Sequence, residues 1–369
     1  MKILIVGGGI GGLTAAIASC RKGFQVEIIE KDPDWTVYGV GIIQQANVVR
    51  AVAQLGILDE YLDASVGFDF VEVYRPDGGL IARIPTAKLA EGYPSNLGIS
   101  RPALQKVLGD NARKAGAAVR LGVVVERLDQ GENGIDVAFS DGTKGYYDLV
   151  VGADGLYSQM RQEHFPEARA PEFTGQGVWR YNLPRPEGMD CLRSYEGQVA
   201  SGLVPLSRDL VYMFVTTPEP GNPRYPHDGL AAAMREKLQQ AALPMREMAE
   251  QITDDEGVVY KPLEWHFMEG DWFKGRLVLI GDAVHGTTPH LGQGAGMAIE
   301  DGIVLAEELA AHVGDISGAL KAYQQRRFER CKYIVEASVA ICMSQLGKGP
   351  HLEQAPATTE MFKVTAQPI

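Results

Sequence analysis

The first seventeen residues, "MKILIVGGGIGGLTAAI", constrain the fold of this chain more than any other stretch. A short apolar run, "KILIV", is followed at once by a glycine-rich turn and then by apolar residues at helical spacing. A second strand-like run, "QVEIIE", occupies residues 25–30. A strand, a helix and a strand in this order predict a parallel sheet with a right-handed crossover. We therefore expect an α/β fold with a parallel sheet at its start.

Each glycine of the first turn has a steric reason to be glycine in a dinucleotide-binding unit. Gly7 makes the tight turn, Gly9 lets the backbone approach a pyrophosphate, and Gly12 lets the helix pack closely on the strand. The helix N-terminus then offers unpaired N–H groups and a partial positive charge to phosphates. Glu30 ends the second strand, where an acidic group can accept hydrogen bonds from ribose hydroxyls. The pattern predicts a Rossmann-like domain that binds a dinucleotide.

A second strand, glycine-rich turn and helix occur near the other end, in "GRLVLIGDAVHGTTPHLGQGAGMAIEDGIVLAEEL". Asp282 directly follows the buried strand, so we expect its carboxylate to face a ligand, and a ribose or ribityl hydroxyl is a natural partner. Pro289, Gly292 and Gly294 then lead to a helix N-terminus, which favours developing negative charge. Reduced flavin carries such charge, so the second turn indicates FAD rather than NAD.

The order of the expected elements predicts two domains and a tail. We assign to the cofactor domain residues 1–67, 101–171 and 274–347. We assign to an inserted, mostly antiparallel β-sheet domain residues 68–100 and 172–273. Helices are expected at 44–62, 101–115, 229–241, 294–312 and 316–344, and Ser100 is a plausible N-cap of the second. The stretch "FDFVEVYRPDGGLIARI" alternates around "PDGG", which predicts a β-hairpin. Residues 348–369 are polar and contain proline, so we expect a loosely held C-terminal tail.

Charge and composition exclude several classes of partner. The formal net charge of −12 disfavours nucleic acid and anionic lipid surfaces. No segment approaches the roughly 20 apolar residues that span a bilayer, so we expect no stable membrane association. The four cysteines form no CxxC pair, which favours reduced thiols in a cytoplasmic protein. A monomer and a homodimer both remain open.

At this point three motifs resemble one family, the single-component FAD-dependent aromatic hydroxylases, which includes p-hydroxybenzoate, salicylate and urate hydroxylases. The N-terminal turn is similar to its ADP-binding turn. "DLVVGADGLYSQMR", with Asp154 and Gly155, resembles its DG motif, and "GRLVLIGDAVHGTTPHLGQGAGMAIED", with Asp282, resembles its GD motif. The resemblance runs from residue 2 to about residue 340. It implies that the two glycine turns hold the two halves of one FAD.

The resemblance also implies a reaction. NADH or NADPH reduces the flavin, O2 adds at its C4a carbon to give a hydroperoxide, and this hydroxylates an activated aromatic or heteroaromatic small molecule. The flavin supplies the chemistry, while the protein supplies position, dryness and charge. The alternative is another FAD-dependent oxidoreductase on the same fold, such as an oxidase, a reductase or a halogenase-like enzyme.

The resemblance implies further site residues, and each has a simpler reading beside it. The implied cofactor contacts are Arg101, Val125, Asp154, Gly292, Gly294 and Ala295. Val125 is equally well explained by core packing. The implied catalytic residues are Tyr212, which is as well explained as a core tyrosine, and Pro289, which also stiffens its loop.

The substrate contacts that we expect are Gln44, Arg180 and Tyr195. For Arg180 a purely structural role in bracing the sheet is the favoured alternative. His285 and His290 suggest a metal, but no third ligand follows at a suitable spacing, so we expect none.

Overall fold

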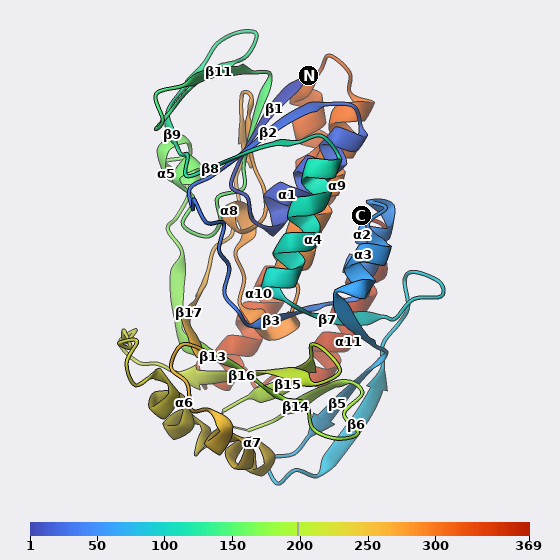
Figure 1. Cartoon of the computed structure of the whole chain (residues 1–369), viewed down its shortest axis with the longest axis vertical. Helices are drawn as coiled ribbons and strands as arrows, with labels where there is room; N and C mark the ends of the chain where they lie inside the picture. Colours follow the sequence, from blue (N-terminus) through green and yellow to red (C-terminus); the bar gives the residue numbers. More distant parts are fainter. Residues whose placement is uncertain (198) are drawn as a thin grey trace.

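One sheet contains the predicted start of the fold. The computed structural model describes residues 1–197 and 199–369, and its first sheet has six strands (Figure 1). Their order is β18 (Phe273–Lys274), β19 (Leu277–Leu279), β12 (Leu149–Gly152), β1 (Lys2–Val6), β2 (Gln25–Glu30) and β8 (Ala118–Leu121). All neighbours pair in parallel except β18 with β19. Val6 pairs with Gly152 and Gly152 with Leu279, so β1, β12 and β19 end at one edge of the sheet.

Three helices pack around this sheet. They are α1 (Ile10–Arg21), α4 (Arg101–Lys114) and α9 (Gly294–Ala311), and α1 contacts the other two. The predicted cap of α4 is confirmed, because the Ser100 hydroxyl accepts a hydrogen bond from the Ala103 N–H at 3.3 Å. The core between sheet and helices is aliphatic, and Leu4, Leu13 and Ile28 are fully buried in it.

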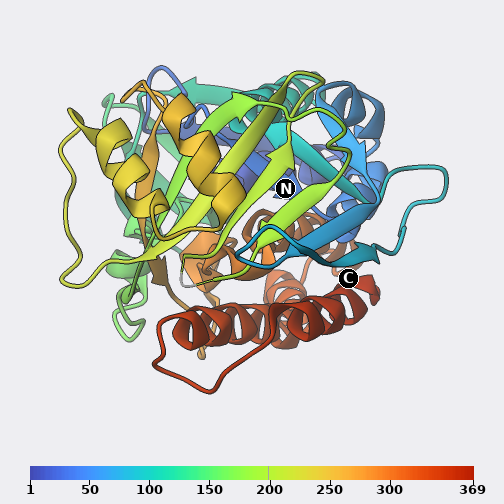
Figure 2. The same cartoon turned by 90° about the horizontal axis from the view of Figure 1, so that it is seen from below.

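A second, seven-stranded sheet forms the other half of the molecule (Figure 2). Its order is β17 (Val259–Trp265), β13 (Glu172–Pro184), β16 (Leu210–Pro218), β15 (Ser201–Pro205), β14 (Leu192–Tyr195), β5 (Phe70–Tyr74) and β6 (Leu80–Pro85). Strands β5 and β6 are the predicted hairpin, and only β14 and β5 pair in parallel among the described strands of this sheet.

One face of the seven-stranded sheet is covered by helices. The expected helix at 229–241 is found as α6 (Leu230–Leu238), and α7 (Leu243–Met248) with a short 3-10 turn η1 (Ala249–Gln251) follows it. They bury Trp179, Met213 and Met234 in a second core. Side chains alternate along a strand. Val178 and Arg180, which flank Trp179 in the sequence, therefore face the opposite side of the sheet, toward the cavity.

Two three-stranded sheets complete the strand content of the described residues. They are β3 (Gly41–Gln44), β7 (Asn96–Ser100) and β4 (Ser65–Phe68), and β11 (Lys144–Tyr147), β10 (Ile135–Phe139) and β9 (Val125–Gln130). The expectation of one helix over 44–62 is wrong. Gln44 ends β3, and two helices follow, α2 (Ala46–Gln54) and α3 (Leu58–Asp63). Gly56, with a φ of +59°, separates them, since a left-handed residue ends a helix.

Four further helical elements of the described residues precede residue 346, and one of them is the second helix predicted near the C-terminus. These helices are α5 (Gln159–His164), α8 (Asp282–His285), the 3-10 turn η2 (Pro289–Leu291) and α10 (Ile316–Gln345). The predictions for 294–312 and 316–344 are confirmed within one residue by α9 and α10. Among the described residues, none of the helices combines the length and the apolar character needed to cross a bilayer.

The expectation of a loosely held tail is wrong. Residues 354–366 form a helix, α11 (Gln354–Ala366), that packs on α10 and α2 (Figures 1 and 2). Met361 is fully buried against Leu291 and Ile341. The Arg50 guanidinium donates to the carbonyls of three residues at the end of α11, at 2.9–3.0 Å. Arg50 lies over 300 positions before these carbonyls, so the polar composition of the segment did not reveal the contact.

Removing the Arg50 guanidinium tests how α11 is held. In Arg50→Ala the last carbonyls of α11 lose charge-assisted hydrogen bonds, each contributing about 1.5 kcal/mol or more. We expect amide hydrogen exchange across 354–369 to accelerate at least tenfold, with the parallel sheet unchanged. Arg75→Ala, which removes a solvent-exposed pair with Asp77, is the matched control. Unchanged exchange in Arg50→Ala would show that α11 docks through its apolar face alone.

Candidate active site

A cavity of about 510 Å³ lies between the two large sheets. Gly9 and Gly281 line it from the two glycine turns, and Tyr212 lines it from the seven-stranded sheet. Phe362 of α11 lines it from a fourth direction. Segments from both ends of the chain therefore share one space, of the size usual for a small-molecule site.

The first glycine turn is shaped by close backbone approaches. Gly7 has a φ of +113°, and an added Cβ would lie 2.4 Å from the Ala153 oxygen. At Gly12 an added Cβ would lie 2.0 Å from the Gly7 oxygen. At Gly9, by contrast, nothing lies within 4 Å of that position. The turn is thus tight where strand and helix meet and open where a pyrophosphate is expected.

Side chains around this turn hold it in place. The Glu30 carboxylate accepts a hydrogen bond from the Gly8 N–H at 2.8 Å. Trp35 Nε1 and Gln105 Nε2 both donate to the Gly8 oxygen, each at 2.8 Å. Glu30 therefore lies beside the turn, and its contact with a ribose hydroxyl stays a prediction. Trp35 and Gln105 were missed, because neither belongs to the glycine motif.

Val125 is the first residue of β9 and lies close to the end of β2 that carries Glu30. The N–H of Val123, two residues earlier, donates to the Glu30 oxygen at 3.0 Å, so β9 begins beside the end of β2. The Val125 side chain is buried in the main core and does not line the cavity. Any contact with a cofactor would come from its backbone, and this role stays a prediction.

The second turn presents Asp282 to the cavity. Gly281, with a φ of +61°, turns the chain after β19, and Asp282 begins α8. The carboxylate is open to the cavity but enclosed by its walls, and this burial raises the pKa of Asp282 against the opposing effects of His285 and Arg101. Asp282 lines the cavity, so its carboxylate is accessible to a ligand there, and the hydroxyl contact stays a prediction.

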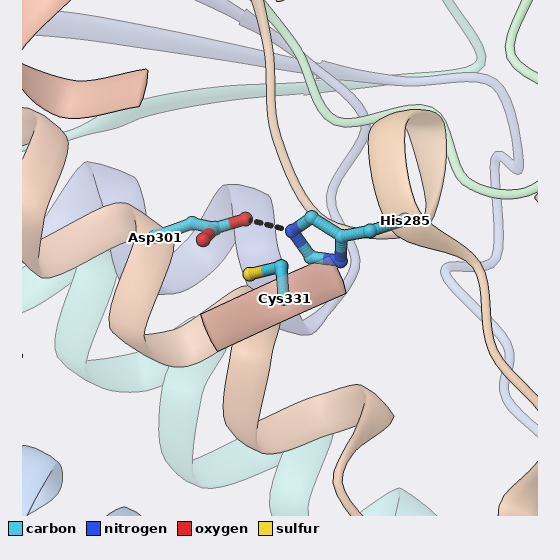
Figure 3. Close-up of side chains that lie close together, drawn as sticks. All are labelled: His285, Asp301 and Cys331. Atoms are coloured by element: carbon cyan, nitrogen blue, oxygen red, sulfur yellow. Dashed lines mark hydrogen bonds and ion pairs between the residues drawn. The ribbon is translucent and has the colours of Figure 1, made fainter. Parts of the chain in front are cut away.

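A buried ion pair between His285 and Asp301 holds this turn in place (Figure 3). His285 Nε2 lies 2.6 Å from an oxygen of Asp301, and both residues are fully buried. The same carboxylate accepts hydrogen bonds from the Gly281 N–H at 2.9 Å and from Arg327 at 2.8 Å. Burial opposes protonation of His285, but Cys331 and Asp301 outweigh it and raise the pKa of the imidazole. The pair therefore fixes the backbone that carries Asp282.

The group His285, Asp301 and Cys331 also has the composition of a metal site, with ligand atoms within 4.8 Å of one another (Figure 3). The contacts favour an ion-pair role instead. The Arg327 guanidinium lies 2.8 Å from Asp301 and 3.5 Å from the Cys331 sulfur, and a fixed positive charge there opposes a cation. His290, the other candidate ligand, lies elsewhere, between Thr288 and Gln345.

The loop after α8 forms one wall of the cavity. Pro289 begins the turn η2, and Gly292, with a φ of +65°, leads into α9. Gly294 and Ala295 are the first two residues of α9, and both line the cavity together with Pro289. The unpaired N–H groups at this helix start give the wall a partial positive charge. Burial lowers the pKa of His290 to about 4, so its imidazole adds no charge at neutral pH.

Arg101, Arg180 and Tyr212 meet where the cavity reaches the seven-stranded sheet. An added Cβ on Gly41 would lie 2.9 Å from the Tyr212 Cβ, so this glycine lets β16 approach. Burial and the nearby Arg180 lower the pKa of Arg101 to about 10. Within the described part of the chain Arg180 Nε is buried without a hydrogen-bond partner. This argues against the favoured expectation that Arg180 only braces the sheet.

Two expected substrate contacts do not reach the cavity. Gln44 is fully buried, with its amide bonded to the Ile43 oxygen and to the Tyr61 hydroxyl, each at 2.8 Å. Gln45, one residue later, lines the cavity instead. Tyr195 faces the second core, where its ring stacks on Tyr74 at 5.0 Å. Both expectations were wrong in side-chain direction, because alternation along an extended chain places neighbours on opposite faces.

Several cavity residues carried no signal in the sequence. Gln45 lines the cavity and accepts a hydrogen bond from Gln293, the residue before α9, which also donates to Asn47 at 3.1 Å. Phe362 lies in the segment expected to be a tail. Glutamines and a C-terminal phenylalanine are common anywhere in a chain, and only tertiary packing brings these together.

The residues present fit an FAD. Asp154 Oδ1 and Thr287 Oγ1 are buried and lack a partner among the described residues. Both lie at the cavity, Thr287 in its wall and Asp154 between the lining residues Ala153 and Gly155. Buried polar atoms are normally paired, so each of these calls for a polar group of a ligand. Together with the open space at Gly9, they match the hydroxyl-rich chain of a dinucleotide.

Comparison with known proteins agrees with this site. A family profile described as an FAD binding domain matches residues 1–338. Aurachin C monooxygenase/isomerase of Stigmatella aurantiaca is 32% identical over 360 residues, covering 94% of this chain and 90% of that protein. The 3-hydroxybenzoate 6-hydroxylase of Polaromonas naphthalenivorans is 30% identical over 359 residues, covering 92% and 86%.

Solved structures are similar over almost the whole chain. HpxO of Klebsiella pneumoniae, complexed with FAD and uric acid, matches with a TM-score of 0.84 and 25% identity, covering 99% of this chain and 92% of that chain. The chain therefore belongs to the FAD-binding-domain family, among the FAD-dependent aromatic hydroxylases. It is an FAD-dependent monooxygenase that uses O2 and a reduced nicotinamide.

Asp282→Ala tests the hydroxyl contact at the second turn. A hydrogen bond to a charged group contributes about 1.5–3 kcal/mol, so we expect the Kd for FAD to rise roughly ten- to a hundredfold. Titration of the apoprotein followed by flavin fluorescence measures this. Asp271→Ala, at an exposed carboxylate after β17, is the control and should bind FAD normally. Normal FAD affinity in Asp282→Ala would contradict the assignment.

Proposed function

We propose that this enzyme hydroxylates an aromatic or heteroaromatic ring that carries an ionisable oxygen, with Arg180 and Tyr212 orienting that ring. One observation carries the proposal: the cavity is lined on one side by both glycine turns and on the other by Arg180 and Tyr212. A ring bound against the seven-stranded sheet would therefore lie next to the flavin half of the cofactor. Bound FAD supplies the reduction of O2 and the transfer of one oxygen atom to the ring.

The two arginines favour an anionic substrate. Arg101 and Arg180 face the same space, and Arg180 is close enough to lower the pKa of Arg101. The unpartnered Nε of Arg180 is a free donor on that wall. A phenolate, enolate or carboxylate oxygen would satisfy it and offset the repulsion. Holding a ring oxygen in its deprotonated form raises the electron density of the ring carbons that must react.

Tyr212 is placed to orient the ring. It is largely buried on β16, packs against Phe214 at 5.9 Å and lines the cavity. Its hydroxyl can donate a hydrogen bond to an anionic ring oxygen of a substrate or accept one from a protonated ring oxygen. A core tyrosine of the second half of the molecule, such as Tyr195, faces the other side of the sheet.

The loop from Pro289 to Ala295 supplies the electrostatic part of the site. The start of α9 stabilises negative charge that develops on the ligand beside it. Pro289 fixes the direction of the wall, and the buried ion pair of His285 with Asp301 holds the adjacent turn. These groups are ordered before a substrate arrives, so they need no reorganisation during the reaction.

We further propose that the enzyme works in the cytoplasm. All four cysteines are free thiols, and Cys191, Cys331 and Cys342 are buried. Burial raises the pKa of the Cys191 thiol to about 12, which keeps it protonated and unreactive. Such thiols persist in a reducing compartment.

A substrate panel tests the proposed activity. The FAD-loaded enzyme is incubated with NADH or NADPH and with phenols, hydroxybenzoates and hydroxylated N-heterocycles. We expect one group of these compounds to stimulate NAD(P)H oxidation and O2 uptake, and to give a product heavier by one oxygen atom. Stimulated oxidation that yields only hydrogen peroxide with every compound would contradict hydroxylation of this substrate class.

Tyr212→Phe tests the role of this tyrosine. Without the hydroxyl the ring is held less well, so we expect kcat/KM for hydroxylation to fall roughly tenfold or more and the share of NADH lost as hydrogen peroxide to rise. The flavin spectrum should stay unchanged. Tyr195→Phe, at a buried tyrosine two strands away that faces the second core, is the matched control. Unchanged coupling in Tyr212→Phe would assign this tyrosine to packing alone.

A further inference from the structure

The cavity extends far beyond the space beside the two glycine turns. Its wall includes residues of all seven strands of the seven-stranded sheet, and beyond β17 it runs across six neighbouring strands, from β13 to β6. The lining residues on these strands are Val178, Arg180, Tyr212, Phe214, Thr216, Ser201, Val204, Leu192, Ser194, Val71, Val73 and Ile84. Neighbouring strands lie about 4.8 Å apart, so five spacings amount to roughly 24 Å. One aromatic ring fills only a small part of that length.

The chemistry of the wall changes along this length. Arg180 and Tyr212 provide charge and a hydroxyl at the end nearest the flavin loop. At the far end we define the distal arm as Val71, Val73, Ile84, Leu192 and Ser194, from β5, β6 and β14. Ser194 is its only polar member, and the arm holds no charged side chain.

The charged residues of the same strands point away from the arm. Glu72 lies between Val71 and Val73, and it pairs on the other face with Arg83 at 2.6 Å and with Arg193 at 3.2 Å. Alternation along the strands thus places Val71 and Val73 toward the cavity, and Glu72 with its arginine partners away from it. The apolar character of the arm is consistent over three neighbouring strands.

Helix α11 lines the same cavity with one face. The lining residues are Ala355, Thr358, Thr359 and Phe362, at spacings of three, four and seven residues that fall on one side of a helix. Met361 and Thr365 point to the other side, where they are buried. The C-terminal helix therefore encloses the cavity with small side chains and one aromatic ring, and adds no charge to it.

We propose that the distal arm binds an aliphatic chain of several carbons attached to the ring of the substrate. The substrate class is then an aromatic or heteroaromatic ring with an anionic oxygen at the Arg180 end and an apolar tail along β14, β5 and β6. This inference rests on the proposed function, since it extends the same site. Each methylene that moves from water into such an arm strengthens binding about fourfold.

A homologous series of 4-n-alkylresorcinols, from ethyl to nonyl, tests the inference. These compounds keep one ionisable ring and vary only the tail. Binding to the FAD-loaded enzyme is measured from the change in the flavin absorbance spectrum, without turnover. We expect Kd to fall about fourfold per added methylene until the arm is full, and then to level off.

Variants that shorten the arm locate the effect. In Val73→Phe we expect the Kd of the heptyl homologue to rise at least tenfold, while that of the ethyl homologue changes less than twofold. Ser194→Leu, which narrows the arm from β14, should act in the same direction if Val73→Phe fails to fold. Leu80→Phe is the matched control, because Leu80 lies on β6, is half exposed and does not line the cavity.

The outcomes separate this inference from the proposed function. A Kd that does not depend on tail length, or a series that leaves the flavin spectrum unchanged at every length, would overturn the distal arm as a tail site. Short hydroxylated rings that still gain one oxygen atom would then leave the proposed function standing. A clear dependence on tail length with no oxygen transfer to any compound would instead support the arm and contradict the proposed function.

Discussion

The parallel pairing of β1, β12 and β19 is the interaction on which the rest of this structure depends. Parallel strands end at one edge of their sheet, and whatever follows them meets there. Gly7 follows β1, Asp154 follows β12 two residues on, and Asp282 follows β19 after a short turn. Segments separated by almost 280 residues of sequence thus face one cavity. A cofactor as long as FAD can be held at both of its ends only because the sheet brings these turns together.

The second constraint is a buried polar network behind the flavin wall. Asp301 joins the Gly281 backbone, His285 and Arg327, and the adjacent Glu300 pairs with Arg327 at 2.7 Å and Arg330 at 3.2 Å. Charges this deep cost desolvation energy, and their benefit lies in geometry more than in stability. The Arg330 guanidinium also donates hydrogen bonds to the carbonyl oxygens of Gln367 and Pro368, just beyond α11, at 2.7 and 2.6 Å. The same polar network therefore holds both the turn that carries Asp282 and the C-terminal helix α11, which lines the substrate end of the cavity.

The two halves of the molecule use alternation along strands for different purposes. In the seven-stranded sheet one face builds a core with α6 and α7, while the other face is left to the cavity. Trp179 and Arg180 are neighbours in sequence, yet Trp179 packs in the second core and Arg180 lines the cavity, because they lie on opposite faces of the sheet. The same rule keeps Glu72 and its arginine partners out of the apolar end of the cavity.

The sequence predicted what local patterns determine. The βαβ start, the capped helix at Arg101, the β5–β6 hairpin and the helices α9 and α10 follow from periodicity and turn residues. The motif resemblance led to Asp154, Asp282 and Tyr212. Side-chain direction was less accessible: Gln44 and Tyr195 were each one position from residues that line the cavity, since strand boundaries fix which face a residue takes.

Long-range contacts were beyond the sequence entirely. Helix α11 is polar and follows a proline-bearing segment, and it is held by Arg50 and Arg330 and by burial of Met361. None of these partners is near it in the chain. The Nε of Arg180 likewise has no hydrogen-bond acceptor among the described residues around it, and no sequence motif predicts that.

Comparative binding of FAD and FMN tests the central claim most directly. The claim is that one cofactor is held at both ends, with its adenosine diphosphate half at the Gly7 turn and its flavin half beside Asp282 and α9. Calorimetric titration of the apoprotein should give one FAD bound per chain, with a Kd at least a hundredfold below that of FMN, which lacks the adenosine half. Equal affinities for FMN and FAD, or no binding of FAD, would contradict the account.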